Sequence, residues 1–290
     1  MIRSPPTPQP CFILVTLAAK TFEMEQTIFP FDRTIPGIYE QYLGPYIFEP
    51  YAVYVSSRIK GSPQQVLEIA SGTGRVTRHI AERIGKTATL TATDLNPGML
   101  NIARQQVDAS NVEFREADAQ ELPFPDNSFD CVICQFGYMF LPERQKGFNE
   151  AWRVLRPGGQ FLFVTWDKPE NNITYHISHQ TVLQFLKAPP PPFYGKPYTM
   201  HDPIELQKHL ADAGFTTVTI EKISLHGESP SAMNVATGFV EGNAIVHEIL
   251  KEGPELLETI KQAVAAKINE EVSKDPVRSE LNAWVGEAFK

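Results

Sequence analysis

Cysteine, long apolar runs and excess positive charge are all scarce in this chain of 290 residues. Three cysteines cannot build a disulfide framework, so the composition favours a reducing, cytoplasmic compartment. No apolar run approaches the roughly 18 residues needed to span a bilayer. The 26 basic and 34 acidic side chains leave a net charge of −8, which argues against a protein that binds nucleic acid through its phosphates.

Proline is in excess, with 24 residues, and it clusters near the N-terminus and at 189–192. Because the first residues are rich in proline and show no helical or strand period, we expect 1–23 to be a disordered leader. An upstream start codon, with Met24 as the functional first residue, is the alternative. The apolar stretch 11–19 faintly resembles a signal-peptide core, but its proline-rich flank carries one positive charge, which disfavours secretion.

Short apolar runs alternate with helical patterns from residue 66 onward. Strands are expected at 66–70, 89–94, 111–118, 129–136 and 160–166. Helices are expected between them, for example where Val76, Ile80 and Ile84 recur at helical spacing. Strands that alternate with helices imply right-handed crossovers and a parallel sheet covered on both faces. The pattern predicts a doubly wound α/β domain.

The regular alternation of short strands and helices ends after residue 166. Helices are expected at 175–186, 203–213 and 231–274, and strands at 215–225 and 281–289. A single i, i+4 stripe runs through the last helical segment, formed by Leu256, Ile260, Val264, Ile268 and Val272. We interpret this stripe as core packing rather than as a partner interface.

The most informative segment joins the first expected strand to the first helix and reads Glu68-Ile69-Ala70-Ser71-Gly72-Thr73-Gly74. A glycine loop between a strand and a helix exposes backbone N–H groups and lets a ligand approach the backbone closely. Asp94 ends the next strand, where an acidic side chain can accept hydrogen bonds from both hydroxyls of a ribose. Together the loop and Asp94 indicate a cofactor that carries adenosine.

Two other nucleotide fingerprints are missing. Thr77 stands where the third glycine of the dinucleotide pattern G-x-G-x-x-G should be, and no G-x-x-x-x-G-K-[ST] loop is present.

Cys131 and Cys134 spell C-x-x-C, but they lie in a run expected to be a buried strand. Positions three apart in a strand face opposite sides, so one metal ion could not easily bind both thiols.

Four motifs, in this order and spacing, resemble those of the class I S-adenosylmethionine-dependent methyltransferases: ASGTG, TATDLNPGML, EADAQELPFPDNSFDCVICQF and RVLRPGG. The likeness is greatest to the small-molecule branch, methyltransferase type 11, that includes the ubiquinone/menaquinone C-methyltransferases. It covers about 66–166, and residues 35–52 are similar to the N-terminal lid of the same branch. Ala70 replaces the usual first glycine, from which we expect a slightly different loop rather than lost binding.

The resemblance implies a doubly wound, mostly parallel, seven-stranded Rossmann-like sheet. We expect a helical lid at 24–60, a cofactor-binding core at 61–230, a helical cap at 231–276 and the final strand at 277–290. In this fold the seventh strand normally follows the sixth closely, so the cap is expected to be an insertion before the last strand. Because ligands bind at the carboxyl edge of such sheets, the cap should form a roof over the acceptor, with Phe239 in it.

The resemblance also implies cofactor contacts, position by position. The methionine end would meet Glu68, Ala70, Ser71, Gly72 and Gly74, the ribose Asp94, and the adenine Leu95, Met99, Asp118 and Ala119. Gln135 and Phe136 would lie near the sulfonium and the acceptor. An aspartate that ends a strand is also a common turn former, which is the alternative for Asp94 and Asp118.

The motifs define no catalytic base. Methyl transfer is an in-line displacement that depends on alignment, and a base is needed only when the acceptor must lose a proton. Candidates are His176, His179 and Tyr42. The two histidines form an H-x-x-H pair, but no third ligand is spaced to join them, so we expect no metal. Tyr39, Tyr42, Tyr46 and Tyr51 in the lid could favour a sulfonium through cation–π contact or simply pack the lid onto the domain.

These observations predict a methyltransferase that uses S-adenosyl-L-methionine and acts on a small, apolar or aromatic molecule through oxygen, nitrogen or carbon. Two alternatives stay open: a macromolecular methyltransferase acting on protein or RNA, and a domain that binds the cofactor without turnover. Amino-methylating DNA enzymes carry [DN]-P-P-[YF] after the fourth strand, where this chain has Gln135-Phe136-Gly137-Tyr138. Pro10-Cys11, the only Pro-Cys pair, lies in the leader, so no cytosine nucleophile follows that strand.

Overall fold

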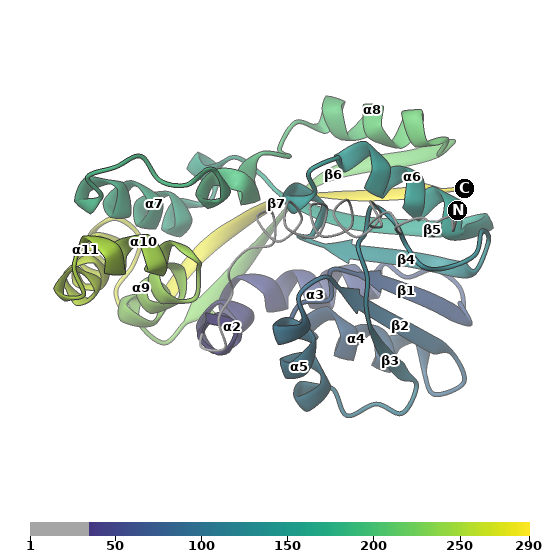
Figure 1. The fold of residues 1–290 in the computed structure, drawn as a ribbon, viewed down its shortest axis with the longest axis horizontal. Helices are drawn as coiled ribbons and strands as arrows, with labels where there is room; N and C mark the ends of the chain where they lie inside the picture. Colours follow the sequence, from purple (N-terminus) through teal and green to yellow (C-terminus); the bar gives the residue numbers. More distant parts are fainter. Residues whose placement is uncertain (1–34) are drawn as a thin grey trace, which may run out of the picture. The chain divides into compact units, whose positions relative to one another are not determined.

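The computed structural model describes residues 35–290, so the leader and the alternative start at Met24 lie outside the described residues (Figure 1). Within 35–290, seven strands form one sheet in the order β3-β2-β1-β4-β5-β7-β6. The first five strands pair in parallel, and β7 pairs antiparallel with both β5 and β6. The doubly wound, mostly parallel α/β fold expected from the sequence is confirmed.

The strands are β1 Gln65–Ile69, β2 Thr89–Asp94, β3 Val112–Glu116, β4 Phe129–Gln135, β5 Leu155–Trp166, β6 Thr217–Ser229 and β7 Val277–Phe289. Every strand expected from the sequence is present, and β5, β6 and β7 are longer than expected. The Arg-Pro-Gly-Gly segment, which was expected to lie before the fifth strand, belongs to β5. It does so because Gly158 and Gly159 exchange backbone hydrogen bonds of 2.8 and 3.1 Å with Lys290, the last residue.

The helices before β5 are α2 Ile35–Ile38, η1 Tyr39–Phe48, α3 Glu49–Ser57, α4 Arg75–Ile84, α5 Pro97–Gln106, η2 Tyr138–Phe140 and α6 Arg144–Val154. Those after β5 are η3 Pro169–Asn171, α7 Ile173–Phe185, η4 Pro192–Tyr198, α8 Pro203–Ala213, α9 Ala232–Glu241, α10 Ile245–Glu252 and α11 Glu255–Glu271. Helix α5 begins at Pro97 because the Asn96 side chain accepts hydrogen bonds from the N–H groups of Gly98 and Met99.

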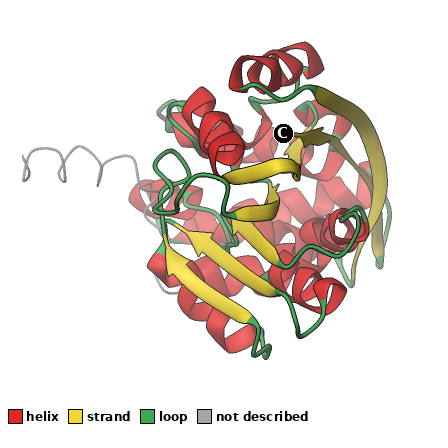
Figure 2. Ribbon diagram, turned by 90° about the vertical axis from the view of Figure 1, so that its right-hand side faces the viewer, coloured by secondary structure: helices red, strands yellow, loops and turns green. Residues whose placement is uncertain are grey.

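Helices cover both faces of the sheet, as Figures 1 and 2 show. Helices α3, α4 and α5 lie on one side, and α6 and α8 lie on the other. The central strands between these layers contribute apolar side chains to the core; Val66, Leu67, Val132 and Phe161 are completely buried. Strands in the middle of a sheet that is covered on both faces are buried on both sides, so the burial of β1, β4 and β5 agrees with the topology.

The helical cap lies in the chain between β6 and β7. These two strands extend beyond their neighbours, and α7, α9, α10 and α11 gather on the extension (Figure 1). Ile260, Val264 and Ile268 of the predicted stripe are completely buried, where α11 packs against α7 and α9. The insertion before the last strand and the core role of the stripe are therefore both confirmed. Among the described helices, none is long and apolar enough to cross a membrane.

The lid is formed by α2, η1 and α3, and η1 is a π-helix that contains Pro45. Two buried tyrosines fasten it to the rest of the molecule. The hydroxyl of Tyr46 lies 2.6 Å from Ser279 Oγ, and the hydroxyl of Tyr51 lies 2.7 and 2.8 Å from the carbonyl oxygens of Ile223 and Leu281, between which its one hydrogen is shared. These two tyrosines pack the lid onto the domain, which was one of the alternatives expected for them. π-Helical turns occur frequently at functional sites.

Candidate active site

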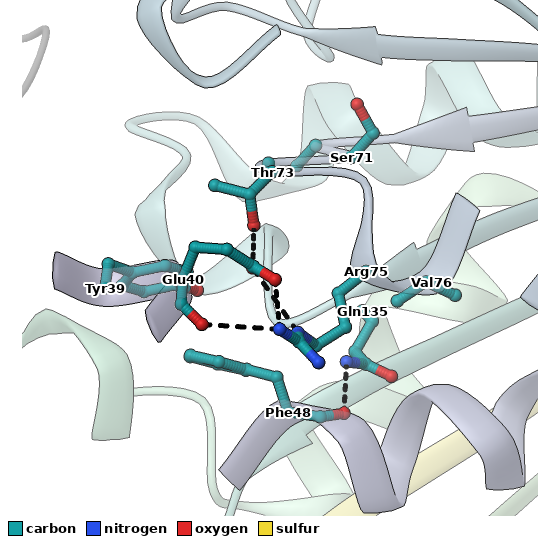
Figure 3. Close-up of a pocket in the computed structure, with 10 residues that line it drawn as sticks. Tyr39, Glu40, Phe48, Ser71, Thr73, Arg75, Val76 and Gln135 are labelled. Carbon is teal, nitrogen blue, oxygen red and sulfur yellow. Dashed lines mark hydrogen bonds and ion pairs between the residues drawn. The ribbon is translucent and has the colours of Figure 1, made fainter. Parts of the chain in front are cut away.

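A pocket lies where the loop between β1 and α4 meets the lid helix η1 (Figure 3). Its lining residues are Tyr39, Glu40, Phe48, Ala70, Ser71, Gly72, Thr73, Arg75, Val76 and Gln135. The loop follows β1, and Gln135 ends β4, the neighbour of β1 on the other side from β2. The strand order reverses between β1 and β4, and ligands of open α/β sheets bind at such a switch point.

The loop between β1 and α4 has three residues in the left-handed region. Ala70, Gly72 and Gly74 have φ values of 55°, 56° and 84°. Ala70 therefore takes a backbone conformation that favours glycine, at a cost of about 1–2 kcal/mol for a residue with a Cβ. A Cβ on Gly72 would meet no atom within 4 Å, whereas one on Gly74 would lie 2.8 Å from Val107 Cγ2. The backbone of Gly72 is therefore open to a ligand, whereas Gly74 packs the loop closely against α5.

Asp94 is joined directly to this loop. Its Oδ2 accepts a 2.8 Å hydrogen bond from the N–H of Gly72, and its Oδ1 accepts one of 2.8 Å from the N–H of Asn96. Burial raises the pKa of Asp94 above its ordinary value, although these N–H groups act in the opposite direction. Each carboxylate oxygen has a second lone pair, so the side chain can hold the loop and still accept a further hydrogen bond.

Three buried polar atoms around the pocket lack a hydrogen-bond partner within the described part of the chain: Glu68 Oε2, Ser71 Oγ and Gln135 Oε1. A buried polar group without a partner costs about 1–3 kcal/mol. Burial also raises the pKa of Glu68 to about 8. Two of the three side chains line the pocket, and Glu68 lies at the end of β1 that leads into the loop. The residues present therefore fit a polar ligand at this point.

The end of β4 carries a strained aromatic residue. Phe136 has a φ of 56°, and its ring stacks on Trp166 with the centroids 3.8 Å apart. Gln135 donates a 3.2 Å hydrogen bond from Nε2 to the carbonyl of Phe48 in the lid. A bulky residue in the left-handed region costs free energy and is found preferentially at functional sites. The two positions expected near the acceptor thus lie against the lid beside the pocket.

A continuous run of aromatic rings leads from the pocket into the cap. Beyond Trp166, the ring of Tyr198 lies 6.3 Å away, and that of Tyr175 lies 3.9 Å further on, stacked on Tyr198. Phe239 of α9 meets the edge of Tyr175 at 5.9 Å. The cap helix α9 also packs directly on η1. The cap therefore reaches the site through the lid and through these rings.

None of the candidate bases is among the residues that line the pocket. His176 and His179 belong to α7 in the cap, and the ring of His179 stacks on Tyr194 at 4.7 Å. Burial, followed by the nearby His176, lowers the pKa of His179 below its ordinary value. Tyr42 is in η1 on the side of α9, because a Cβ on Gly238 would lie 3.1 Å from Tyr42 Cβ.

The residues expected to meet the adenine lie outside the pocket, directly after β2, on α5 and in the turn after β3. Leu95 is exposed, and Met99 and Ala119 are buried. Asp118 Oδ1 accepts a 2.8 Å hydrogen bond from the N–H of Gln120, two residues on. Both Asp94 and Asp118 therefore stabilise local turns, and this role leaves lone pairs free for a ligand.

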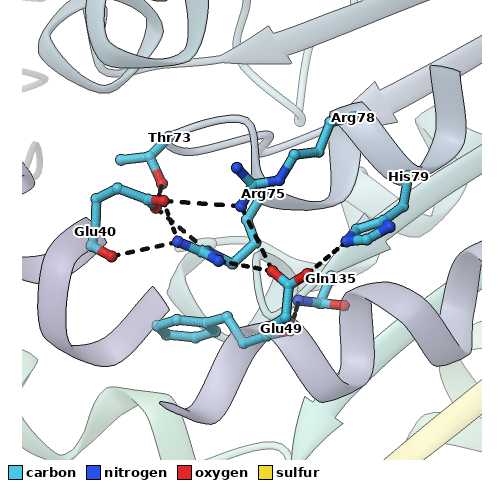
Figure 4. A network of polar contacts seen from close by, with 8 residues as sticks. Glu40, Glu49, Thr73, Arg75, Arg78, His79 and Gln135 are labelled. Atoms are coloured by element: carbon cyan, nitrogen blue, oxygen red, sulfur yellow. Dashed lines mark hydrogen bonds and ion pairs between the residues drawn. The ribbon is translucent and has the colours of Figure 1, made fainter. Parts of the chain in front are cut away.

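A network of charges, which the sequence reasoning missed, joins the lid to the start of α4 (Figure 4). Glu49 accepts hydrogen bonds from Arg75 Nη1 at 2.6 Å and pairs with Arg78 at 3.4 Å and His79 at 2.7 Å. Glu40 pairs with Arg75 through a very short contact. The sequence contains one sign of this network. The first turn of α4 begins with Arg75 and holds no acidic residue, although the helix dipole disfavours a cation there, so a partner from another element could have been expected.

No group of three or more histidine, cysteine, aspartate or glutamate side chains in residues 35–290 could hold a metal ion. Cys131 and Cys134 are free and buried, and burial raises the pKa of both thiols. They share no partner: Cys131 Sγ lies 3.9 Å from Gln160 Oε1, whereas Cys134 lies beside Gly137.

The fold, with a glycine loop after β1 and an antiparallel β7, is that of the class I methyltransferases. A solved structure of phosphoethanolamine N-methyltransferase 2 from Haemonchus contortus, in complex with S-adenosyl-L-methionine, has a TM-score of 0.58 and 19% sequence identity; the match covers 89% of this chain and 57% of that chain. This likeness concerns the fold.

The family follows from the sequence comparisons. A family model described as a methyltransferase domain matches residues 67–163. The ubiquinone/menaquinone biosynthesis C-methyltransferase of Pseudomonas syringae pv. tomato is 32% identical over 197 residues, which are 61% of this chain and 74% of that protein. Its counterpart in Pseudomonas aeruginosa is 34% identical over 184 residues, 61% of this chain and 66% of that protein. The chain therefore belongs to the methyltransferase family that includes these enzymes, and it is an S-adenosylmethionine-dependent methyltransferase.

Proposed function

We propose that this enzyme methylates a small apolar or aromatic acceptor, which binds between the pocket at the glycine loop and the helical cap. The observation that carries the proposal is the run of rings from Phe136 and Trp166 through Tyr198 and Tyr175 to Phe239. Such a wall favours an acceptor with an apolar or planar surface, because aromatic faces stack on one another and bury large apolar areas.

S-adenosylmethionine, when bound, supplies a methyl group already activated on a sulfonium. The residues that fit its methionine end are Glu68, Ser71 and Gly72, which combine unpartnered buried polar atoms with an open backbone. Asp94, at the end of β2, is placed to accept hydrogen bonds from ribose hydroxyls. For the adenine we retain Leu95, Met99, Asp118 and Ala119, with Gly74 holding the loop against α5.

The work left for the protein is alignment and exclusion of water. Ideal positioning of two reactants can contribute on the order of 7–11 kcal/mol to the acceleration. The lid and the ring wall would do both: Phe48 covers one side of Phe136 at 5.8 Å, and Tyr51 meets the same ring at 5.3 Å. The lowered pKa of His179 favours the neutral imidazole, which is the form that can accept a proton from an oxygen or nitrogen acceptor. Tyr42 and His176 remain weaker candidates.

The relatives that match this chain are named as C-methyltransferases of ubiquinone and menaquinone biosynthesis. That likeness supports a small-molecule acceptor over a macromolecular one. We also place the reaction in the cytoplasm, since the described cysteines are free thiols in buried positions.

The deciding experiment incubates the purified protein with S-adenosylmethionine and a fractionated metabolite extract and measures release of S-adenosylhomocysteine. We expect release with an apolar or aromatic fraction. Release only with protein or RNA would favour a macromolecular substrate, and cofactor binding without any release would favour a binding domain.

Phe239→Leu then tests the cap as the acceptor wall. It should change the KM for the acceptor and leave the affinity for S-adenosylhomocysteine nearly unaltered. Phe215→Leu is the matched control, because Phe215 is buried to a similar extent but stacks on Phe161 of β5. Equal losses of acceptor kinetics and cofactor affinity in Phe239→Leu would reject the wall.

A further inference from the structure

Glu40 and Arg75 meet at the pocket from two different elements, the lid helix η1 and the first turn of α4 (Figures 3 and 4). The Arg75 guanidinium contacts both oxygens of the Glu40 carboxylate and, at 3.3 Å, the Glu40 backbone carbonyl. Thr73 donates a 2.6 Å hydrogen bond from Oγ1 to Glu40 Oε2. Three residues that line the pocket are therefore bonded to one another.

Among the described residues that line the pocket, Glu40 and Arg75 are the only two that carry charge. Their side chains are 12% and 13% exposed, so both charges are largely removed from water. Removing a pair of charges from water costs free energy that the attraction between them need not recover. A buried ion pair is therefore weak evidence for stability by itself, and its position in the pocket makes both charges candidates for contact with a ligand.

The amino-acid end of S-adenosylmethionine is a zwitterion, with an ammonium and a carboxylate. We propose that Glu40 and Arg75 recognise this end: the Glu40 carboxylate accepts hydrogen bonds from the ammonium, and the Arg75 guanidinium pairs with the carboxylate. In the absence of the ligand the two side chains neutralise each other. The exchange replaces one ion pair with two, so no charge is left without a partner. This inference rests on the S-adenosylmethionine site described above.

Glu40 and Arg75 keep their orientation toward the pocket when the ion pair between them is broken, because each side chain has a second partner. Arg75 Nη1 stays bonded to Glu49 at 2.6 Å, and Glu40 stays bonded to Thr73. Gly44 of η1 allows the guanidinium to approach the lid, since a Cβ there would lie 2.4 Å from Arg75 Nη2. The same residues make the lid part of the recognition site, because Glu40 can reach the ligand only when η1 lies over the loop.

Two ligands separate recognition of the amino-acid end from recognition of the rest. S-adenosylhomocysteine carries the zwitterion, and 5′-methylthioadenosine keeps the adenosine and the thioether but lacks it. Binding of both to the full-length protein is measured by calorimetric titration. In Glu40→Gln and in Arg75→Gln we expect affinity for S-adenosylhomocysteine to fall roughly ten- to a hundredfold, as for loss of a charged hydrogen bond. Affinity for 5′-methylthioadenosine should stay close to that of the wild type.

Glu49→Gln is the matched control, since Glu49 pairs with the same arginine but does not line the pocket. It should alter binding of the two ligands by similar factors, and Glu40→Asp, which keeps the charge, should restore part of the discrimination. The inference is overturned if Glu40→Gln lowers the affinity for both ligands equally. It is also overturned if Glu49→Gln changes the ratio of the two affinities as strongly as Glu40→Gln does. In either case the ion pair would serve only to hold the lid on the loop. If the wild type binds neither ligand, the S-adenosylmethionine site itself is rejected. Thermal unfolding of each variant checks that the lid stays folded.

Discussion

The amide N–H of Gly72 donates a 2.8 Å hydrogen bond to Oδ2 of Asp94, and this contact joins the glycine loop after β1 to the end of β2. The second carboxylate oxygen accepts from the N–H of Asn96, at the start of α5. One side chain thus holds together three elements around the cofactor site. Asp94 therefore orients the loop in addition to the role expected for it at the ribose.

We expect Asp94→Ala to weaken binding of S-adenosylhomocysteine by roughly 2–3 kcal/mol, because charge-assisted hydrogen bonds are lost and the loop loses its anchor. Calorimetric titration measures this change. Asp108→Ala, at an exposed position beyond α5, is the control and should bind normally. An unchanged dissociation constant for Asp94→Ala would remove this residue from the site.

Glu68 makes stability depend on pH in a direction opposite to that of a typical surface carboxylate. Its pKa is about 8 in the folded protein against 4.5 for the ordinary side chain, so between these values the folded state binds more protons than the unfolded state. The free energy of unfolding should therefore fall as pH rises through this window, by at most about 1.4 kcal/mol per pH unit.

Glu68→Gln mimics the neutral carboxyl and should lack this contribution. Urea unfolding at pH 5, 6, 7 and 8 compares it with the wild type, and the stability of the variant relative to the wild type should rise with pH. Glu82→Gln, exposed on α4, should follow the wild type at every pH. Parallel profiles for Glu68→Gln and the wild type would show that Glu68 is ionised in the folded protein.

Gly74, at the start of α4, allows the packing of the loop to be measured against Gly61, an exposed glycine before β1. Both have left-handed φ values, 84° and 64°, so alanine is strained at either position. A Cβ on Gly74 would in addition crowd Val107 and Ala103, whereas one on Gly61 would meet open space. Gly74→Ala should therefore cost about 1–3 kcal/mol more than Gly61→Ala in urea unfolding. Equal costs would mean that the loop does not pack on α5.

The close approach of the lid to Arg75 can be tested at Gly44. A Cβ at this position would collide with the guanidinium, while one on Gly37, also in the lid, would meet nothing within 4 Å. Gly44→Ala should increase hydrogen exchange across residues 39–57 and weaken binding of S-adenosylhomocysteine, and Gly37→Ala should do neither. Because both changes raise helix propensity by about 1 kcal/mol, the comparison isolates the collision. Matching exchange in the two variants would contradict the close contact.

Local sequence patterns were sufficient to predict most of the helices and strands. Strand β2 has the bounds expected from the sequence, and α4 contains the expected Val76, Ile80 and Ile84, because apolar periodicity over ten residues or fewer specifies them. Helix α5 begins at the Asn96-Pro97 pair, since its cap is formed within three residues. The family motifs likewise lie within short segments, so the glycine loop and Asp94 were identified before their contact was seen.

The pairings that complete the site were decided only by the tertiary structure. Glu40 and Arg75 are 35 residues apart, and nothing in either local pattern places a lid carboxylate on the loop. The start of β5 depends on hydrogen bonds to Lys290, and the path from Trp166 to Phe239 depends on rings from four separate elements. Periodicity and capping are set by neighbours along the chain, so the sequence by itself determined the elements, the family motifs and the cofactor loop. Contacts between distant segments depend on how those elements pack, and this packing decided which charges and rings surround the ligand.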